Sequence, residues 1–235
     1  MGLNMENVLI KLLYLVGASV CHQLPERSYF AGPFKIPVCA RCEGIYIGFF
    51  ITAIILFIMF RKKESDLAPL YVLAVAALFV LSTVVDGSLS YFFGFSTNNI
   101  LRFSTGYLAG SAAMTIIYPV FNYQYYSCPA AIKIFSRPWQ FIVFIIISVF
   151  FIIAGILDIK AVNIALLYLS AFSVIFTFYF INIVLLLLIP AFSQKAKRLF
   201  SKYILLPTLA ALFLAGLELY ISYRLHMYMA LLTAK

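Results

Sequence analysis

Long apolar runs separated by short polar segments are the dominant pattern of this chain. Seven runs are predicted to form helices, at residues 7–20, 43–60, 69–93, 100–121, 139–157, 163–189 and 203–223. Runs of roughly 20 apolar residues are long enough to cross a hydrocarbon core of about 30 Å. The first run is short and contains Lys11, so it can lie in the interface instead of spanning. The pattern predicts an all-α fold, a polytopic transmembrane bundle of about seven helices.

Composition agrees with a membrane protein. Of the 235 residues, 65% are hydrophobic and 11% are charged, whereas about a quarter of the residues of a soluble domain are charged. The net charge of +9 does not indicate nucleic-acid binding, because the Lys and Arg residues lie in short loops between the apolar runs. In such loops they report topology and contact anionic lipid headgroups. We therefore expect the lipid bilayer as a partner and no nucleic acid.

Three basic clusters set the expected orientation. They comprise residues 61–63, Lys133 with Arg137, and the group Lys195, Lys197, Arg198 and Lys202. In a seven-span arrangement all three lie on one side, which the positive-inside rule makes cytoplasmic. The N-terminus is then cytoplasmic and the C-terminus outside. We divide the chain into a four-helix membrane core at 1–121, a cytoplasmic loop at 122–138, and a three-helix membrane extension at 139–235.

This orientation brings unusual polar residues to one depth near the outer face. Asp86 falls in the outer third of its helix, on one face with Ser82 and Ser90. Arg102 lies in the first turn of the next span, and Glu218 in the outer third of the last. Ionisable residues in such places are costly unless they pair or bind something. The candidate anion or ligand site comprises Arg27, Ser28, Arg41, Asp86, Asn98, Arg102 and Glu218.

The cysteines suggest a metal site. Cys39 and Cys42 have the two-residue gap that lets both sulfurs reach one tetrahedral ion or close one disulfide. Together with Cys21 and His22 they offer three sulfurs and one nitrogen, a set that fits zinc, with iron or copper as alternatives. Cys21 and His22 are adjacent, so both can ligate only if the first helix has ended, and Pro25 supports this. Two other readings stay open: a disulfide, or small apolar residues at a helix start.

Other features have simpler structural explanations. Asp86 and Arg102 can pair with each other and hold two helices together, in either a structural or a functional role. The small residues Gly106 and Gly110 predict close helix packing. Cys128 stands alone in a loop and receives no role, and His226 is expected to be a solvated tail residue. The sequence has no nucleotide-binding loop, no paired metalloprotease histidines and no serine nucleophile elbow.

A family resemblance follows from these motifs. The stretches Cys-His-Gln at 21–23, Pro-Glu-Arg-Ser at 25–28 and Cys-Ala-Arg-Cys-Glu-Gly at 39–44 resemble the domain of unknown function 2085 family of small prokaryotic membrane proteins. The later stretches Asp86-Gly87, 96–102, Thr105-Gly106 and Gly110 are also similar. The resemblance covers roughly residues 15–115. It implies a prokaryotic plasma membrane location and site residues, but no reaction, and it leaves the last three helices unexplained.

Three functional classes fit the sequence, and they include both an enzyme and proteins without catalytic turnover. The first, which we favour, is a metal-dependent membrane protein with an arginine-rich site for a phosphate-bearing lipid or solute. The second is a thiol oxidoreductase that exchanges electrons between the Cys39/Cys42 pair, Cys21 and a membrane quinone, with Arg41 lowering a thiol pKa. The third is a transporter or an accessory subunit of a membrane complex, using Asp86 and Glu218 as ion or proton sites. A membrane-protein partner or a homo-oligomer is compatible with each.

Overall fold

The computed structural model describes residues 5–61, 63–92, 97–157, 159–199 and 201–233. Within these ranges it confirms an all-α bundle of seven helices. The helices are α1 (Met5–Val20), α2 (Ala40–Met59), α3 (Leu70–Phe92), α4 (Asn99–Tyr125), α5 (Pro138–Ile156), α6 (Lys160–Leu187) and α7 (Leu205–Thr233). Most ends lie within a few residues of those expected, although α7 continues about ten residues further. Phe93, the expected last residue of the third helix, lies outside the described residues.

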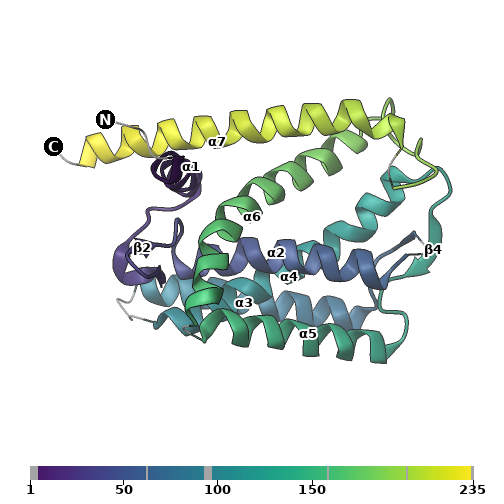
Figure 1. Ribbon diagram of the computed structural model, residues 1–235. Coiled ribbons are helices and arrows are strands. Elements are labelled where there is room, and N and C mark those ends of the chain that lie inside the picture. Colours follow the sequence, from purple (N-terminus) through teal and green to yellow (C-terminus); the bar gives the residue numbers. More distant parts are fainter. Residues whose placement is uncertain (1–4, 62, 93–96, 158, 200, 234–235) are drawn as a thin grey trace.

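Six of these helices, α2 to α7, contain a segment long and apolar enough to cross a membrane. They run back and forth between the same two ends of the bundle, α6 diagonally, whereas α1 is seen end-on (Figure 1). The start of α1 and the end of α7 consequently lie at the same end of the bundle, whereas seven spans would place them at opposite ends. The short first helix, which contains Lys11, is not among the six candidate spans.

The bundle is centred on α2 and α4, which pack against each other more extensively than any other pair. A Cβ added to Gly110 would lie 1.9 Å from the carbonyl oxygen of Ile45, and one added to Gly44 would lie 2.2 Å from that of Phe103. Backbones this close tolerate no side chain at these positions, which confirms the packing role predicted for the glycines of α4. Deeper in the contact, the Thr52 hydroxyl donates to the Ser111 hydroxyl at 2.9 Å.

The remaining spans surround this pair. About half of the apolar windows of α2, α4 and α6 is buried, but only 17% of those of α3, α5 and α7. The latter three therefore present most of their apolar surface outward, as expected for helices that face lipid. Helix α6 crosses the bundle diagonally and reaches α7, which packs on α6 and α1 (Figure 1).

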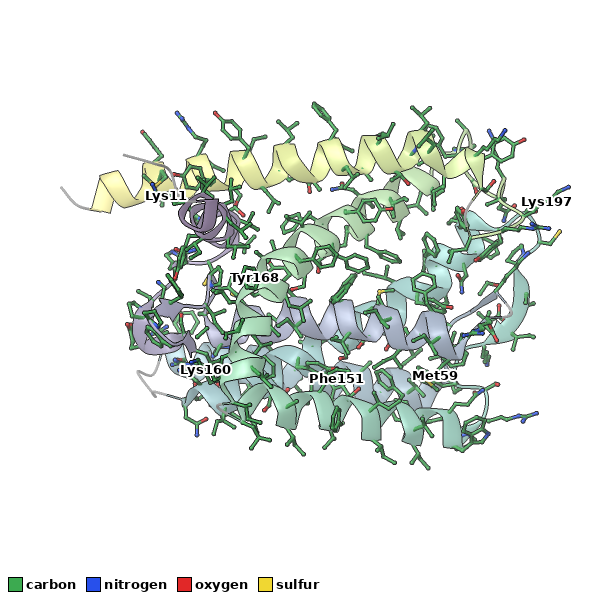
Figure 2. The ribbon with its side chains drawn as sticks, in the orientation of Figure 1. Lys11, Met59, Phe151, Lys160, Tyr168 and Lys197 are labelled. Carbon is green, nitrogen blue, oxygen red and sulfur yellow. The ribbon has the colours of Figure 1, made fainter. Side chains whose placement is uncertain are left out.

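The two ends of the bundle differ in character. At one end, strands β3 (Glu64–Asp66) and β4 (Ala130–Lys133) pair in parallel, and the ammonium of Lys63 donates to the carbonyl of Lys197 at 3.1 Å. All three basic clusters gather here, so we call it the basic end; Lys197 marks it in Figure 2. At the other end, strands β1 (Phe30–Ala31) and β2 (Phe34–Lys35) form a small hairpin. This second end holds the start of α1, the end of α7 and the clustered thiols, and we call it the thiol end.

Candidate functional site

The segment between α1 and α2 is folded tightly against both helices. The backbone of Gln23 is left-handed, with φ of 54°, and its side-chain amide donates to the carbonyls of Tyr14 at 2.8 Å and Pro37 at 2.7 Å. A short 3-10 helix, η1 (Pro25–Arg27), follows, and the buried Ser28 hydroxyl donates to the Leu24 carbonyl at 2.9 Å. These bonds hold the start and the end of the segment together, and therefore also Cys21 and Cys39.

Three thiols meet where this segment enters α2. Cys39 is the N-cap residue of α2, and Cys42 lies one turn further along. Their sulfurs and that of the buried Cys21 all lie within 4.8 Å of one another, and all are free thiols. Four sulfurs around zinc, with bonds of about 2.3 Å in a tetrahedron, would lie roughly 3.8 Å apart. A contraction of about 1 Å would thus let the three sulfurs share one ion.

The surroundings of these sulfurs favour negative charge. The backbone N–H groups of Cys39 and Gln23 point at the Cys21 sulfur, at 3.2 and 3.4 Å. Hydrogen bonds from the thiols of Cys21 and Cys42 lower the pKa of Cys39 to about 2, against an opposing effect of burial. The same hydrogen bond to Cys39 raises the pKa of Cys21. Sulfurs that can share hydrogen bonds in this way form an arrangement in which a cation can replace the protons.

His22 does not join the three thiols. Its exposed ring lies 5.4 Å, centroid to centroid, from the ring of His226 on α7. Because Cys21 still ends a helical turn, with its N–H bonded to the Gly17 carbonyl, the next side chain projects about 100° away from it. His226 was expected in a solvated tail, but its Nδ1 lies 2.9 Å from the Ala18 carbonyl oxygen. The two histidines thus connect the last helix to the end of α1.

Asp86 pairs with Arg41, and the Asp86–Arg102 pair considered from the sequence is wrong. The Nε of Arg41 donates to Asp86 Oδ2 at 2.9 Å, and an Nη2 contact completes the ion pair. Arg41 lies between Cys39 and Cys42 in sequence, so on α2 its side chain projects to a different face, towards α3. Asp86 is buried, and its Oδ1 has no hydrogen-bond partner among the described residues.

Arg102 is buried near this ion pair and bonds to hydroxyls. Its Nε donates to the Thr97 hydroxyl at 3.1 Å, and Nη2 donates to that of Ser90 at 3.4 Å. The residue is 5% exposed, and the charges of Arg27, Arg41 and Asp86 all act on its guanidinium. A guanidinium in this position retains donors and an excess of local positive charge.

The start of α4 completes the site. Asn98 caps the helix, because its side-chain oxygen accepts from the N–H of Leu101 at 2.8 Å. The amide of Asn99 donates to the Ser28 carbonyl at 3.5 Å. Among the candidate ligand residues, Arg41 and Asp86 form an ion pair, and their charges and that of Arg27 act on Arg102. Ser28 and Asn98 belong to the two segments that the Asn99 bond joins. Glu218 is the exception, because it accepts a hydrogen bond at 2.8 Å from Asn182 at the contact of α6 and α7.

Sequence reasoning missed Glu43. This residue follows Cys42, is fully buried, and has both carboxylate oxygens without a hydrogen-bond partner among the described residues. It directly follows Cys42, a member of the thiol cluster. An acidic residue in the first turn of a helix normally stabilises the helix dipole. This ordinary explanation is why sequence reasoning assigned Glu43 no functional role. The useful signal is its position directly after the second cysteine, at the mouth of an apolar span.

Comparisons with known proteins place the site within a family. The family described as predicted membrane protein DUF2085, for domain of unknown function 2085, matches residues 21–116. An uncharacterised protein of Methanocaldococcus jannaschii is 35% identical over 109 residues, which cover 46% of this chain and 68% of the relative. Another, from Methanothermobacter thermautotrophicus, is 37% identical over 91 residues, covering 39% and 78%. No solved structure matches the chain. This multi-pass membrane protein therefore belongs to the DUF2085 family.

Proposed function

We propose that the three thiols hold one zinc-type metal ion at the thiol end of this membrane protein. The observation that supports this is the approach of three sulfurs to within 4.8 Å of one another from two separate segments of the chain. Thiolate ligands select zinc, copper(I) and iron–sulfur centres over hard cations. The N–H groups directed at Cys21 and the low pKa of Cys39 are further support, because a metal site requires deprotonated sulfur.

The proposed site has three protein ligands and one open position. Four-coordinate structural zinc sites are closed, whereas sites that act on a substrate keep a position for water or a ligand atom. His22 packs against His226 and leaves that position free. The buried carboxylate of Glu43 next to the cluster is an additional polar group that a bound molecule can contact.

The arginines beside the thiols form the second part of the proposal, a site for a phosphate group. Arg41 is balanced by Asp86, whereas Arg102 bonds to neutral hydroxyls and is flanked by the charge of Arg27. Guanidinium groups match phosphate oxygens in pairs. We infer that this protein binds a phosphate-bearing lipid or solute next to its metal ion. The proposal concerns binding and specifies no reaction.

Metal analysis of the detergent-purified protein, with a count of reactive thiols, tests the first part. We expect about one metal ion per chain and protected thiols. Cys39→Ser and Cys42→Ser should each lose the metal and unfold at lower temperature, because the free energy of binding contributes to folding. Cys128→Ser is the matched control, since this thiol is exposed and lies outside the cluster. His22→Ala should retain the metal.

Other results would contradict the proposal in distinguishable ways. Full metal content in both Cys39→Ser and Cys42→Ser would remove these sulfurs as ligands. A metal-free protein with a disulfide would favour the oxidoreductase, the second candidate, which the low pKa of Cys39 also supports. That pKa makes Cys39 a good leaving group but a weaker attacking nucleophile, so we rank metal binding first. Transport has less support, because Asp86 and Glu218 already have partners.

A further inference from the structure

A large apolar cavity lies at the opposite half of the bundle from the thiols. It has a volume of about 830 Å³ and lies between α2, the end of α4, α6 and the start of α7. Phe57, Phe121 and Phe180 form its innermost wall, with ring centroids 5.2–6.3 Å apart. We call it the lateral cavity, because its rim includes side chains on the outer surface, such as Ile58 (60% exposed) and Leu205 (64% exposed).

The apolar walls of the lateral cavity favour a hydrocarbon chain over water as the bound molecule. A buried water requires two to four polar partners, and the aromatic inner wall supplies none. A volume of about 830 Å³ also leaves room for a flexible hydrocarbon chain. A flexible chain of methylene groups meets both requirements, and the bilayer provides such chains at the outward-facing rim.

One end of the lateral cavity is polar and basic. Ser201, Lys202 and Thr208 belong to its lining, and Lys202 begins the short 3-10 helix η2 (Lys202–Ile204) that leads into α7. The connecting segment 190–204 contains four basic residues and no acidic one. Positive charge at the membrane end of an apolar cavity complements a lipid with an anionic headgroup.

We propose that the lateral cavity binds one anionic phospholipid from the leaflet at the basic end, with a hydrocarbon chain against the phenylalanine wall and its phosphate at Lys202. Lys202 supplies selectivity for the headgroup, and the aromatic wall supplies most of the contact with the chain. This site is separate from the phosphate site proposed at the thiol end and does not depend on it. Phe57 lies fifteen residues along α2 from Cys42, a rise of about 22 Å.

Lipid retention in nanodiscs tests the proposal. The full chain is reconstituted with equal amounts of phosphatidylglycerol and phosphatidylcholine and transferred to mild detergent, and bound lipids are counted by native mass spectrometry. Wild type should retain one phosphatidylglycerol with about fivefold preference over phosphatidylcholine, as one lysine near an anionic headgroup supplies. Lys202→Gln should retain a lipid without that preference. Lys133→Gln, an exposed basic residue at the same end but outside the cavity, should behave as wild type.

A second pair of variants tests the hydrocarbon part. Thr208→Trp places a large side chain inside the lateral cavity and should abolish retention, whereas Leu209→Trp, on the exposed face of α7, should not. Equal retention by these two variants, no headgroup preference in wild type, or an unchanged preference in Lys202→Gln would each overturn the proposal. If Thr208→Trp fails to fold, the lysine pair still decides, because both lysines are exposed.

Discussion

The Arg41–Asp86 ion pair allows a quantitative test of how the thiol end is held together. The side chain of Asp86 is 3% exposed and that of Arg41 is 22% exposed. Removing one partner of a buried ion pair costs about 3–5 kcal/mol, because the other charge remains buried and unpaired. Arg41→Gln should fall at the upper end of this range, since it leaves a carboxylate with almost no access to solvent. Asp86→Asn should fall at the lower end, because Arg41 can extend towards water.

Thermal unfolding in mild detergent, followed by intrinsic fluorescence, measures these losses. For a chain of this length about 1 kcal/mol corresponds to roughly 2–4 °C in Tm, so the single variants should unfold about 6–20 °C below wild type. The double variant should recover much of the loss, because an amide pair leaves no buried charge. A double-mutant cycle on these two residues should therefore show strong coupling.

Arg102→Gln provides the matched comparison. It removes a nearby buried guanidinium that bonds to Thr97 and Ser90 and not to Asp86. A double-mutant cycle of Arg102→Gln with Asp86→Asn should show clearly weaker coupling than the cycle of Arg41→Gln with Asp86→Asn. Additive losses in the Arg41–Asp86 double variant, or stronger coupling between Asp86 and Arg102, would refute the assigned pairing.

Two further predictions concern packing and topology. Gly110→Ala should strongly lower Tm, because the added Cβ would lie 1.9 Å from the Ile45 carbonyl oxygen. The control Gly216→Ala, whose Cβ would have nothing within 4 Å, should be neutral or stabilise the protein by about 0.5–1 kcal/mol. Equal losses of stability in the two variants would argue against the α2–α4 contact. Topology reporters fused to the two ends of the chain should both report the extracytoplasmic side, and a reporter inserted at Lys197 should report the cytoplasm. If the two end reporters fall on opposite sides of the membrane, α1 spans it.

The helices could be predicted from the sequence because a membrane span needs little more than length and apolarity. The direction in which α1 runs relative to the other helices, however, could not be predicted from the sequence. A 16-residue helix that contains Lys11 fits either a short span or a crosswise position, and its contacts with α6 and α7 determine which one forms. Those contacts involve residues about 200 positions apart, such as Ser19 and Ser222, and no local pattern encodes them.

The sequence predicted which residues of the candidate site lie at the same depth in the membrane, but not which of them pair with each other. Helical positions and loop lengths brought Cys21, Cys39 and Cys42 to one end, and the structure confirms that they cluster. The partner of Asp86 depends on the rotation of α2 relative to α3 and α4. That rotation is set by the close glycine contacts between α2 and α4, which direct Arg41 towards α3. Gly44 marks the close contact in the sequence, but the rotation of α2 can be predicted from it only once the residues of α4 that face Gly44 are known.

The two proposed sites differ in which part of the chain builds them. Every residue of the thiol cluster, together with Arg41, Asp86 and Arg102, falls within residues 21–116, the segment that matches the family. The lateral cavity combines α2, which lies within that match, with residues beyond it: Phe121, part of α6, and Leu199, Ser201, Lys202, Ile204, Leu205 and Thr208. Helix α7 also reaches back to the thiol end, where His226 meets His22 and Ala18. Helices α6 and α7 therefore contribute to both ends: with the segment that connects them they line one side of the lateral cavity, and they contact the crosswise α1 beside the thiols. Loss of α7 should consequently disturb the thiol cluster through α1, although none of the three sulfurs lies on that helix.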